Sequence, residues 1–340
     1  MGRPRPNRTA TLTFPMHSSM STQPESSSNP LRWRGLLLGA ITRFLSDRDP
    51  ATLAEIRASM EREIDAAGAD ALVQLGERLA KSGSDWGYNP PDPLARRIHH
   101  VLANWTLKPD STLVGAEHGA AVAGKQVVLF ANHLSYSDAN VLEVMLSRWR
   151  LPLAERLTVV AGPKVYSSPK RRFSSLCFGT VKTPQPPTRA SENAVMPLRD
   201  LVRAARQSIE IAHERLTAGE ALVIFGEGTR SRTRELQQMM KGVERYLDPP
   251  GTLVMPVGIV GSDEMYPIGD DTLYPVRIVV ALGRPVDAQE LRERSKDDGR
   301  VMMDAVGLAI ADLLPPEYRG AYAAAADLGD ARAVHAALWS

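Results

Sequence analysis

The sequence predicts an α/β fold, a mixed sheet flanked by helices, which follows a smaller helical domain. Beyond Ser111, short apolar runs alternate with helix-favouring segments, the pattern of a sheet that carries helices on its faces. Residues 31–107 contain helix-favouring runs instead. The chain has 340 residues, of which 43% are hydrophobic, and this is enough for one large domain with a sizeable core and a helical appendage.

The first 30 residues have the composition of a disordered tail. Glu25 is their only acid, and serine, threonine and proline are abundant beside three early arginines. A transit peptide has a similar composition, but we favour the tail. Met20 offers an alternative start of the chain.

Residues 31–107 are predicted to form the helical domain. Apolar residues recur at helical spacing from Leu31 to Leu45, with arginines nearby, which fits either a helix on a membrane surface or a helix facing the core. The residues from Thr52 to about Lys81 favour a helix, and so do those from Leu94 to Trp105. Pro90 to Pro93 break the chain between these two runs.

Residues 108–315 are predicted to form the α/β domain, and residues 316–340 an alanine-rich tail that ends in a helix or a loosely packed segment. Helices are expected from Asp138 to Trp149, Ala190 to Leu216 and Glu235 to Leu247, and Ser137 or Asp138 is placed to cap the first by accepting backbone N–H bonds. Strands are expected in the runs Val127 to Phe130, Leu157 to Ala161, Phe178 to Lys182, Ala221 to Phe225, Leu253 to Val260 and Val276 to Ala281.

Composition argues against several classes of function. The net charge is only +2, and no aromatic residues interleave a basic stripe, so we expect no nucleic-acid partner. No run approaches the ~20 consecutive apolar residues of a membrane-spanning helix, so we expect a cytoplasmic protein, in solution or peripheral at the inner face of the membrane. The single cysteine, Cys177, excludes an intramolecular disulfide and a Cys-based zinc site, and its apolar neighbours predict a buried thiol. His99 and His100 point to different faces of a helix, so we expect a solvated or partner-facing pair and no metal site.

A histidine and an aspartate separated by four residues follow the apolar run that ends at Phe130. The segment reads Asn132-His133-Leu134-Ser135-Tyr136-Ser137-Asp138. A strand that ends in a histidine puts the imidazole at the rim of the sheet, and an aspartate at the start of the next helix can fold back and orient it. The pair predicts a general base, although this spacing alone also occurs by chance.

A second motif, 94 residues after His133, strengthens this interpretation. Glu227-Gly228-Thr229-Arg230-Ser231 follows the apolar run Ala221 to Phe225. Together the two segments resemble the signature of the glycerolipid acyltransferase family, in which an N-H-x-x-x-x-D block (the HX4D motif) and an E-G-T-R-S block build one active site. Lys241-Gly242 and the run Val254 to Ile259 resemble two weaker features of that family in the same order. The resemblance covers about residues 110 to 285 and implies the family's mixed α/β fold.

Departures from the family pattern bear on the acceptor. Gly226 stands where the family usually has a proline, and the intermediate block that commonly supplies an arginine reads Phe178 to Thr183 here. The long segment between the two motifs and the run Val160 to Lys164 resemble the soluble, plastid-type glycerol-3-phosphate acyltransferases more than the lysophosphatidate enzymes. The acceptor therefore stays open between these two groups.

Acyl transfer to an alcohol needs a base, because a hydroxyl is a poor nucleophile at neutral pH. His133 is the expected base, and Asp138 is expected to accept the other imidazole N–H and fix the tautomer. The substrate hydroxyl takes the place of a catalytic serine, since no G-x-S-x-G elbow is present. Direct transfer within a ternary complex follows.

The second motif is assigned to substrate binding. Arg230 is the first candidate for an acceptor phosphate, because a guanidinium can bind two oxygens at once, and Arg232 can join it from an extended loop. Gly228 lets the backbone approach the ligand, Thr229 belongs to the same loop, and Glu227 holds either an acceptor hydroxyl or the loop itself. Lys182 and Arg189 are further phosphate candidates, or else ordinary surface cations.

The resemblance implies that a fatty acyl group passes from acyl-CoA or acyl-carrier protein to a glycerophosphate hydroxyl in phospholipid biosynthesis. We favour 1-acyl-sn-glycerol-3-phosphate as acceptor, with glycerol-3-phosphate or a lyso-amino-acid lipid as alternatives, and we expect no cofactor beyond the thioester. The run Lys170 to Arg172 could meet anionic lipid or an acidic carrier protein, or be a solvated loop. An acyl thioesterase and a non-catalytic lipid-binding protein are the alternatives of other classes.

Overall fold

The computed structural model describes residues 29–43, 45, 49–81, 87–166, 169–184, 197–270, 272–323 and 328–340. The expected tail before residue 29 and the candidate Arg189 lie outside these ranges. The α-helices are α1 (Pro30–Arg43), α2 (Pro50–Ala67), α3 (Ala69–Lys81), α4 (Pro93–Thr106), α5 (Ala116–Ala121), α6 (Asp138–Arg148), α7 (Pro169–Ser175), α8 (Leu198–Thr217), α9 (Ser262–Met265), α10 (Ala288–Arg294), α11 (Gly299–Asp312) and α12 (Gly329–Trp339). The 3-10 helices are η1 (Pro152–Arg156), η2 (Pro163–Tyr166), η3 (Lys241–Leu247), η4 (Pro316–Tyr318) and η5 (Gly320–Tyr322).

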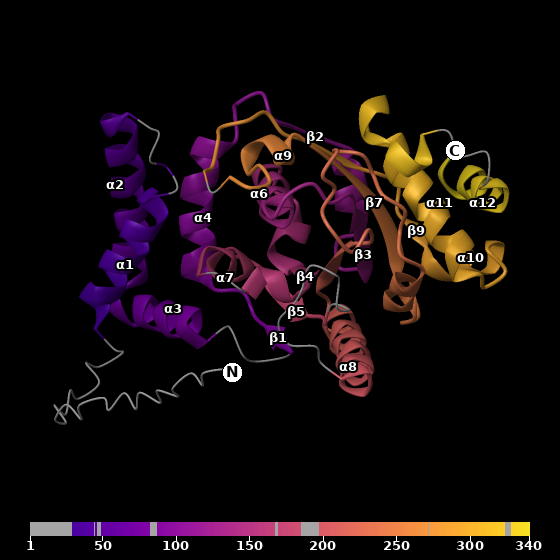
Figure 1. The fold of residues 1–340 in the computed structure, drawn as a ribbon, viewed down its shortest axis with the longest axis horizontal. Coiled ribbons are helices and arrows are strands. Elements are labelled where there is room, and N and C mark those ends of the chain that lie inside the picture. Colours follow the sequence, from indigo (N-terminus) through magenta and orange to yellow (C-terminus); the bar gives the residue numbers. More distant parts are fainter. Residues whose placement is uncertain are drawn as a thin grey trace, which may run out of the picture.

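One mixed sheet runs through the middle of the molecule (Figure 1). Its strands are β1 (Tyr88–Asn89), β2 (Thr112–Val114), β3 (Val127–Ala131), β4 (Leu157–Ala161), β5 (Gly179–Lys182), β6 (Ala221–Phe225), β7 (Leu253–Val260), β8 (Val279–Leu282) and β9 (Val286–Asp287). They follow the order β1-β5-β4-β6-β3-β7-β8-β2, and β9 also pairs with β7. The five strands from β5 to β7 in this order are parallel. At the two ends of this group, β1 is antiparallel to β5 and β8 is antiparallel to β7, while β2 is parallel to β8. The predicted mixed α/β fold is confirmed.

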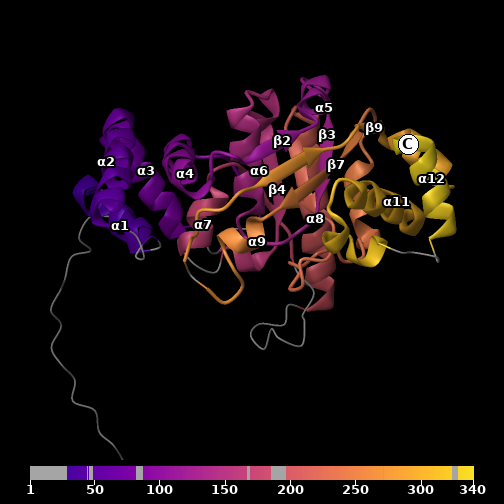
Figure 2. The same ribbon diagram turned by 90° about the horizontal axis from the view of Figure 1, so that it is seen from above.

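Helices cover both faces of the sheet, which explains why its central strands are apolar throughout. In β3, Val127, Leu129 and Ala131 belong to the core cluster shared with α1 to α4 and α6. Val128 and Phe130 point to the opposite cluster, shared with α8, α10, α11 and α12. Figure 2 shows the sheet between these two groups of helices. A parallel strand buried on both faces needs apolar side chains at every position, and all of β3 is buried.

The amino-terminal helices α1 to α3 gather at one end of the molecule, beside α4 (Figure 1). Trp33 of α1 lies so close to Gly76 of α3 that a Cβ at Gly76 would stand 2.1 Å from Cδ2 of the indole. Leu37 and Leu38 are buried in the core cluster, while Leu36 is exposed. Of the two roles expected for this segment, core packing is therefore confirmed. Contact with a membrane stays a prediction.

Several expected elements need correction. The run Glu235 to Leu247 is not one helix, because only η3 is helical and its backbone is wound as a 3-10 helix. The backbone before η3 does not form helical hydrogen bonds. The N–H of Leu236 donates to the carbonyl of Tyr318, and the N–H of Met240 donates to the carbonyl of Gly226. The last expected strand was Val276 to Ala281, but the observed strand, β8, begins at Val279. Val276 lies before it and forms only an isolated bridge with Leu107. The alanine-rich tail ends in a helix, α12, and α12 packs in the core cluster that contains α11.

The two adjacent histidines of α4 are not a solvated pair. Nε2 of His99 lies 3.2 Å from the carbonyl oxygen of Asn140, and Nε2 of His100 lies 2.9 Å from Oε2 of the buried Glu143, so both dock α4 on α6. Burial lowers the pKa of His99 to about 4, which keeps this ring neutral. Cys177 is buried as expected, and burial raises the pKa of its thiol. Within the described ranges, no helix is long and apolar enough to cross a membrane.

Candidate active site

The carboxyl ends of three neighbouring parallel strands bring both sequence motifs to one edge of the sheet. Ala131 of β3 lies between Phe225 of β6 and Val257 of β7 in the register. His133 follows the end of β3 and Glu227 follows the end of β6. Two segments that are 94 residues apart in the sequence therefore meet because their strands are neighbours, at the edge where α/β sheets bind ligands.

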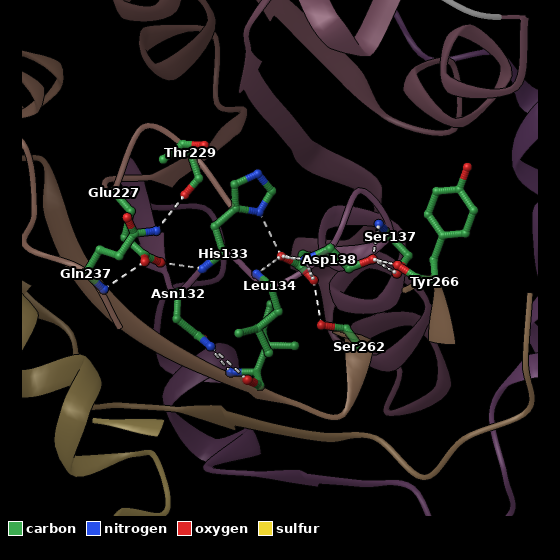
Figure 3. A network of polar contacts seen from close by, with 12 residues as sticks. Asn132, His133, Leu134, Ser137, Asp138, Glu227, Thr229, Gln237, Ser262 and Tyr266 are labelled. Atoms are coloured by element: carbon green, nitrogen blue, oxygen red, sulfur yellow. Dashed lines mark hydrogen bonds and ion pairs between the residues drawn. The ribbon is translucent and has the colours of Figure 1, made fainter. Parts of the chain in front are cut away.

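His133 and Asp138 form the expected pair. Nδ1 of His133 lies 2.8 Å from Oδ2 of Asp138, which is fully buried (Figure 3). The same carboxylate accepts the backbone N–H groups of Leu134 at 2.7 Å and Ser135 at 3.0 Å, and the hydroxyl of Ser262 donates to Oδ1 at 2.6 Å. Asp138 is thus held by four donors, and its orientation is fixed by the folded chain.

The imidazole of His133 has one nitrogen left for a substrate. With Nδ1–H donating to Asp138, Nε2 carries the lone pair. Nε2 has no hydrogen-bond partner among the described residues, and Figure 3 shows it turned away from Asp138. The ring stacks on Phe225 with 4.3 Å between centroids and is 18% exposed. An oriented, accessible imidazole with a free lone pair is the arrangement of a general base.

The capping expected at the start of α6 takes a different form. Ser137 makes no side-chain cap, and its hydroxyl instead donates to that of Ser135 at 3.0 Å. Asp138 does accept backbone N–H groups, but those of Leu134 and Ser135 in the preceding loop and not those of the helix. The carboxylate therefore shapes the loop that carries His133 rather than the helix that follows.

Asn132 extends the pairing of β3 with β7 beyond the last strand residue. Its Nδ2 donates to the carbonyl of Ile259 at 2.9 Å, and its Oδ1 accepts the N–H of Ile259 at 2.7 Å (Figure 3). The side-chain amide thus replaces a backbone peptide at the point where β3 turns away from β7. This interaction holds the residue next to His133, and it explains an asparagine to which the sequence had assigned no role.

Glu227 joins the two motif loops to each other. Its Oε1 accepts the N–H of His133 at 2.6 Å, and its Oε2 accepts the N–H of Gln237 at 2.8 Å. Of the two roles expected for Glu227, this geometry favours holding the loop. Burial raises the pKa of this carboxyl from its ordinary value of 4.5 to about 7, and the charge of Asp138 contributes in the same direction.

The loop after β6 is shaped by its glycines. Gly228 has a φ of +72°, and its N–H donates to the carbonyl of Phe225 at 3.1 Å. A side chain at Gly226 would meet Cε of Met239 at 2.3 Å, so the methionine occupies the space that the usual proline of the family would need. Thr229 is exposed, and its carbonyl accepts Nε2 of Gln237 at 3.3 Å.

The candidate phosphate ligands Arg230, Arg232 and Lys182 lie in different surroundings. The guanidinium of Arg230 stacks on Tyr136, with 3.6 Å between Cζ and the ring centroid, and so lies beside the His133 loop. Arg232 is exposed on the same loop. Lys182 ends β5, which two strands separate from β3, a backbone distance of roughly 14 Å. The residue is buried, and its Nζ lies 4.4 Å from the centroid of the Tyr166 ring.

A largely apolar cavity of about 510 Å³ opens beside the histidine loop. Apolar side chains of α1, α3, α4 and α6, among them Leu37, Leu102 and Val144, line most of it. Tyr136 and Ser137, from within the first motif, line it as well. A cavity of this size and character suits an apolar ligand or the apolar part of an amphiphile, held with one end near His133.

Some residues of the site had no assigned role at the sequence level. Ser262, Gln237 and Tyr136 contact motif residues, yet only Tyr136 lies inside a motif. Ser262 follows the end of the run Leu253 to Val260, so a polar residue after a buried strand is the signal that could have identified it. Gln237 contacts Glu227 through its backbone N–H, which leaves no signal in the sequence, and it contacts the carbonyl of Thr229 through its side chain.

Comparison with known proteins gives a matching family model and similar solved structures. Residues 112–260 match the family model described as Acyltransferase. No curated protein matches the chain. One of these structures is the crystal structure of the 1-acyl-sn-glycerophosphate (LPA) acyltransferase PlsC from Thermotoga maritima, with a TM-score of 0.44 and 18% identity over 70% of this chain and 87% of that one. The match to the family model spans both motifs and the strands that bring them together. Residues 112–260, which hold both motifs, are therefore similar to the Acyltransferase family, in agreement with the resemblance of the two motifs to the glycerolipid acyltransferases.

Proposed function

We propose that this acyltransferase moves a fatty acyl group from acyl-CoA or acyl-carrier protein to the hydroxyl of a glycerophosphate, with 1-acyl-sn-glycerol-3-phosphate as the favoured acceptor. The observation that carries the proposal is the 2.8 Å contact between His133 and the buried Asp138, beside an apolar cavity. The cavity supplies a place for an acyl chain, and the accessible Nε2 supplies the base. The product would be a phospholipid precursor.

The proposed reaction is a direct transfer. Nε2 of His133 takes the proton from the acceptor hydroxyl while the oxygen attacks the thioester carbonyl carbon. Asp138 stabilises the imidazolium that forms. The tetrahedral intermediate then loses its C–S bond, and the departing sulfur takes the proton from the imidazolium. An ester and a free thiol result, no atom changes oxidation state, and we propose no cofactor beyond the thioester co-substrate.

Arg230 is the proposed ligand of the acceptor phosphate. It lies on the loop that Glu227 ties to His133, so a phosphate bound there stays at a set distance from the base. No described acid forms an ion pair with Arg230, which leaves its charge for an anionic substrate. Arg232 can add a second cation from the same exposed loop, and Gly228 and Thr229 supply its backbone.

We also propose that α1 meets the surface of a membrane. Leu31 and Leu36 of this helix are 78% and 51% exposed, and Leu36 and Arg43 line the cavity. An exposed apolar edge next to a cation suits the lipid interface. Flotation with anionic vesicles tests this proposal: the parent should bind, a Leu31→Ser, Leu36→Ser double variant should bind less, and equal binding would contradict it.

The activity is tested with purified protein and a radiolabelled donor, acyl-CoA or acyl-carrier protein, offered with 1-acyl-sn-glycerol-3-phosphate or glycerol-3-phosphate. Products are separated by thin-layer chromatography. We expect labelled phosphatidate from the parent and almost none from His133→Ala. Labelled lysophosphatidate from glycerol-3-phosphate would move the protein to the first acylation step.

Arg230→Ala separates transfer from hydrolysis. A transferase should lose transfer to phosphate-bearing acceptors in this variant, whereas an acyl thioesterase needs no phosphate site and should keep releasing fatty acid. Free fatty acid as the sole product of the parent, undiminished in Arg230→Ala, would refute the proposed transfer. Lipid binding without any turnover would instead support a non-catalytic lipid-binding protein.

A further inference from the structure

Tyr136 lies between the phosphate candidate and a second arginine. It belongs to the loop between His133 and Asp138 and is half-buried. Cζ of Arg230 lies 3.6 Å from the centroid of its ring, and Cζ of Arg171 lies 4.0 Å from the same point. Both distances are those of a guanidinium stacked on an aromatic face.

The two guanidiniums must lie on opposite faces of the ring. At 4.0 Å or less from the centroid, neither group can stand at the ring's edge, where it would overlap the ring atoms. One face of a phenol has room for only one stacked guanidinium, and two on the same face would overlap each other and repel. Tyr136 therefore stands between the two cations and keeps their charges apart.

The partners of Tyr136 come from different parts of the domain. Arg230 belongs to the loop after β6, whereas Arg171 belongs to α7 and also donates through a terminal nitrogen to the carbonyl of Lys164 at 3.1 Å. Arg171 and Tyr136 line the apolar cavity, and Arg230 does not. One face of Tyr136 is thus supported from the cavity side, and the other supports Arg230.

We infer that Tyr136 is the positioning residue for the acceptor phosphate, with Arg171 holding its ring from the other face. The inference rests on the proposed function, because it assumes that Arg230 binds the phosphate. Stacking restricts a long, flexible side chain while leaving the N–H groups at the edge of the guanidinium free to donate. No described acid pairs with Arg230, so Tyr136 is the group that the structure offers for this restraint.

The test compares Tyr136→Leu with Tyr136→Phe. Leucine removes the aromatic face, while phenylalanine keeps the face and removes only the hydroxyl. We expect Tyr136→Leu to raise the KM for the acceptor by about 3- to 30-fold, the range that corresponds to the usual strength of a cation–π contact, with a much smaller change in kcat and in the donor KM. Tyr136→Phe should restore the acceptor KM. Arg171→Met should raise the same constant, since it removes the charge that holds the ring.

A binding measurement separates this inference from the proposed function. Inorganic phosphate is titrated calorimetrically into the parent, Tyr136→Leu, Tyr136→Phe and Arg230→Ala, each with its Tm measured. Phosphate affinity that falls in Tyr136→Leu and Arg230→Ala but not in Tyr136→Phe supports the inference even if no acyl transfer is found. Transfer that occurs with an acceptor KM and phosphate affinity unchanged in Tyr136→Leu overturns the inference alone.

Two further outcomes count against it. A Tyr136→Phe variant as poor as Tyr136→Leu would show that the hydroxyl acts, not the face. A parent that binds no phosphate overturns both the inference and the role of Arg230. If Tyr136→Leu does not fold, the acceptor KM and the phosphate affinity of Arg171→Met are compared with those of the parent instead, because this variant leaves the motif loop unchanged.

Discussion

Oε1 of Glu227 accepts the backbone N–H of His133 at 2.6 Å, so the carboxyl of one motif holds the residue that begins the other. Its second oxygen accepts the N–H of Gln237 at 2.8 Å. The loop with Arg230 and the loop with the base are therefore fixed to each other through one buried side chain. A change at Glu227 is expected to alter stability and the relative placement of the two loops together.

The raised pKa of Glu227 predicts that stability depends on pH. Its pKa is about 7 in the folded chain against 4.5 ordinarily, so its contribution is fully present below pH 4.5 and is lost as the pH rises through 7. The loss should amount to about 3 kcal/mol of unfolding free energy, from 1.36 kcal/mol per pKa unit. Urea unfolding of the parent and of Glu227→Gln between pH 4.5 and 8 measures it.

Glutamine cannot ionise, so the unfolding free energy of Glu227→Gln should fall less over this range than that of the parent. The variant should also be less stable by about 1 kcal/mol at low pH, because the amide nitrogen cannot accept an N–H, whereas the hydroxyl oxygen of the protonated carboxyl still has a lone pair that can. Parallel pH dependences in the two proteins would show that Glu227 does not titrate in this window.

The pairing of His133 with Asp138 predicts a large loss of kcat when either residue is replaced. His133→Ala removes the base and should lower kcat at least about 10²-fold. Asp138→Asn keeps the shape but presents an amide N–H to Nδ1, which stabilises the wrong tautomer, and should also lower kcat by about 10²-fold or more. Steady-state kinetics with saturating donor and acceptor measure both.

His213→Ala is a suitable control for these variants. This histidine lies on α8 and hydrogen-bonds the carbonyl of Arg245, outside the site. It should keep the kcat of the parent. An Asp138→Asn enzyme with unchanged kcat and an unchanged pH profile would argue against the proposed orientation of His133.

Asn132 is predicted to be structural rather than chemical. Asn132→Ala removes both hydrogen bonds to Ile259 in a fully buried position and leaves a buried N–H and a buried carbonyl unsatisfied. We expect about 2 to 6 kcal/mol less unfolding free energy, because each of the two unsatisfied buried groups costs about 1–3 kcal/mol. Denaturant unfolding measures this, and a loss below 1 kcal/mol, on the same scale, would contradict it.

The cavity predicts how acyl-chain length is selected. Val144 lies six residues after Asp138 on α6, which is about 9 Å along the helix axis, and it lines the cavity. Val144→Phe should fill part of that space and shift the donor preference to shorter chains, since each excluded methylene forfeits about 0.8 kcal/mol of burial. Competition between donors of different length measures the shift.

The same variant contains its own control. Transfer from the shortest donors should stay near the parental rate, because their chains do not reach Val144. A uniform loss over all chain lengths would indicate damage to α6, and an unchanged preference would show that the acyl chain does not occupy this cavity. Val306→Phe on α11, in the opposite core cluster, tests for general overpacking.

The elements that the sequence predicted correctly have local causes. The strands β3, β4 and β6 were predicted because each is a short apolar run, and burial on both faces requires such a run. The pair of His133 with Asp138 was predictable because a turn between a strand and a helix brings two residues at this spacing together. Glu235 to Leu247 was predicted wrongly as one helix, since its backbone N–H groups bond to Gly226 and Tyr318, which sequence periodicity does not reveal.

By itself, the sequence determined the α/β class, the two motifs and the chemical types of their residues, because local spacing and side-chain chemistry decide these. Only the tertiary structure decided which distant residues bond to the motifs. Glu227 accepts the N–H of His133, 94 residues away. Asn132 bonds to Ile259, 127 residues away, and Ser262 bonds to Asp138, 124 residues away. It also brought the guanidiniums of Arg171 and Arg230 to 4.0 Å and 3.6 Å from the ring centroid of Tyr136. These contacts depend on strand order and helix packing, which many residues determine jointly and no short pattern encodes.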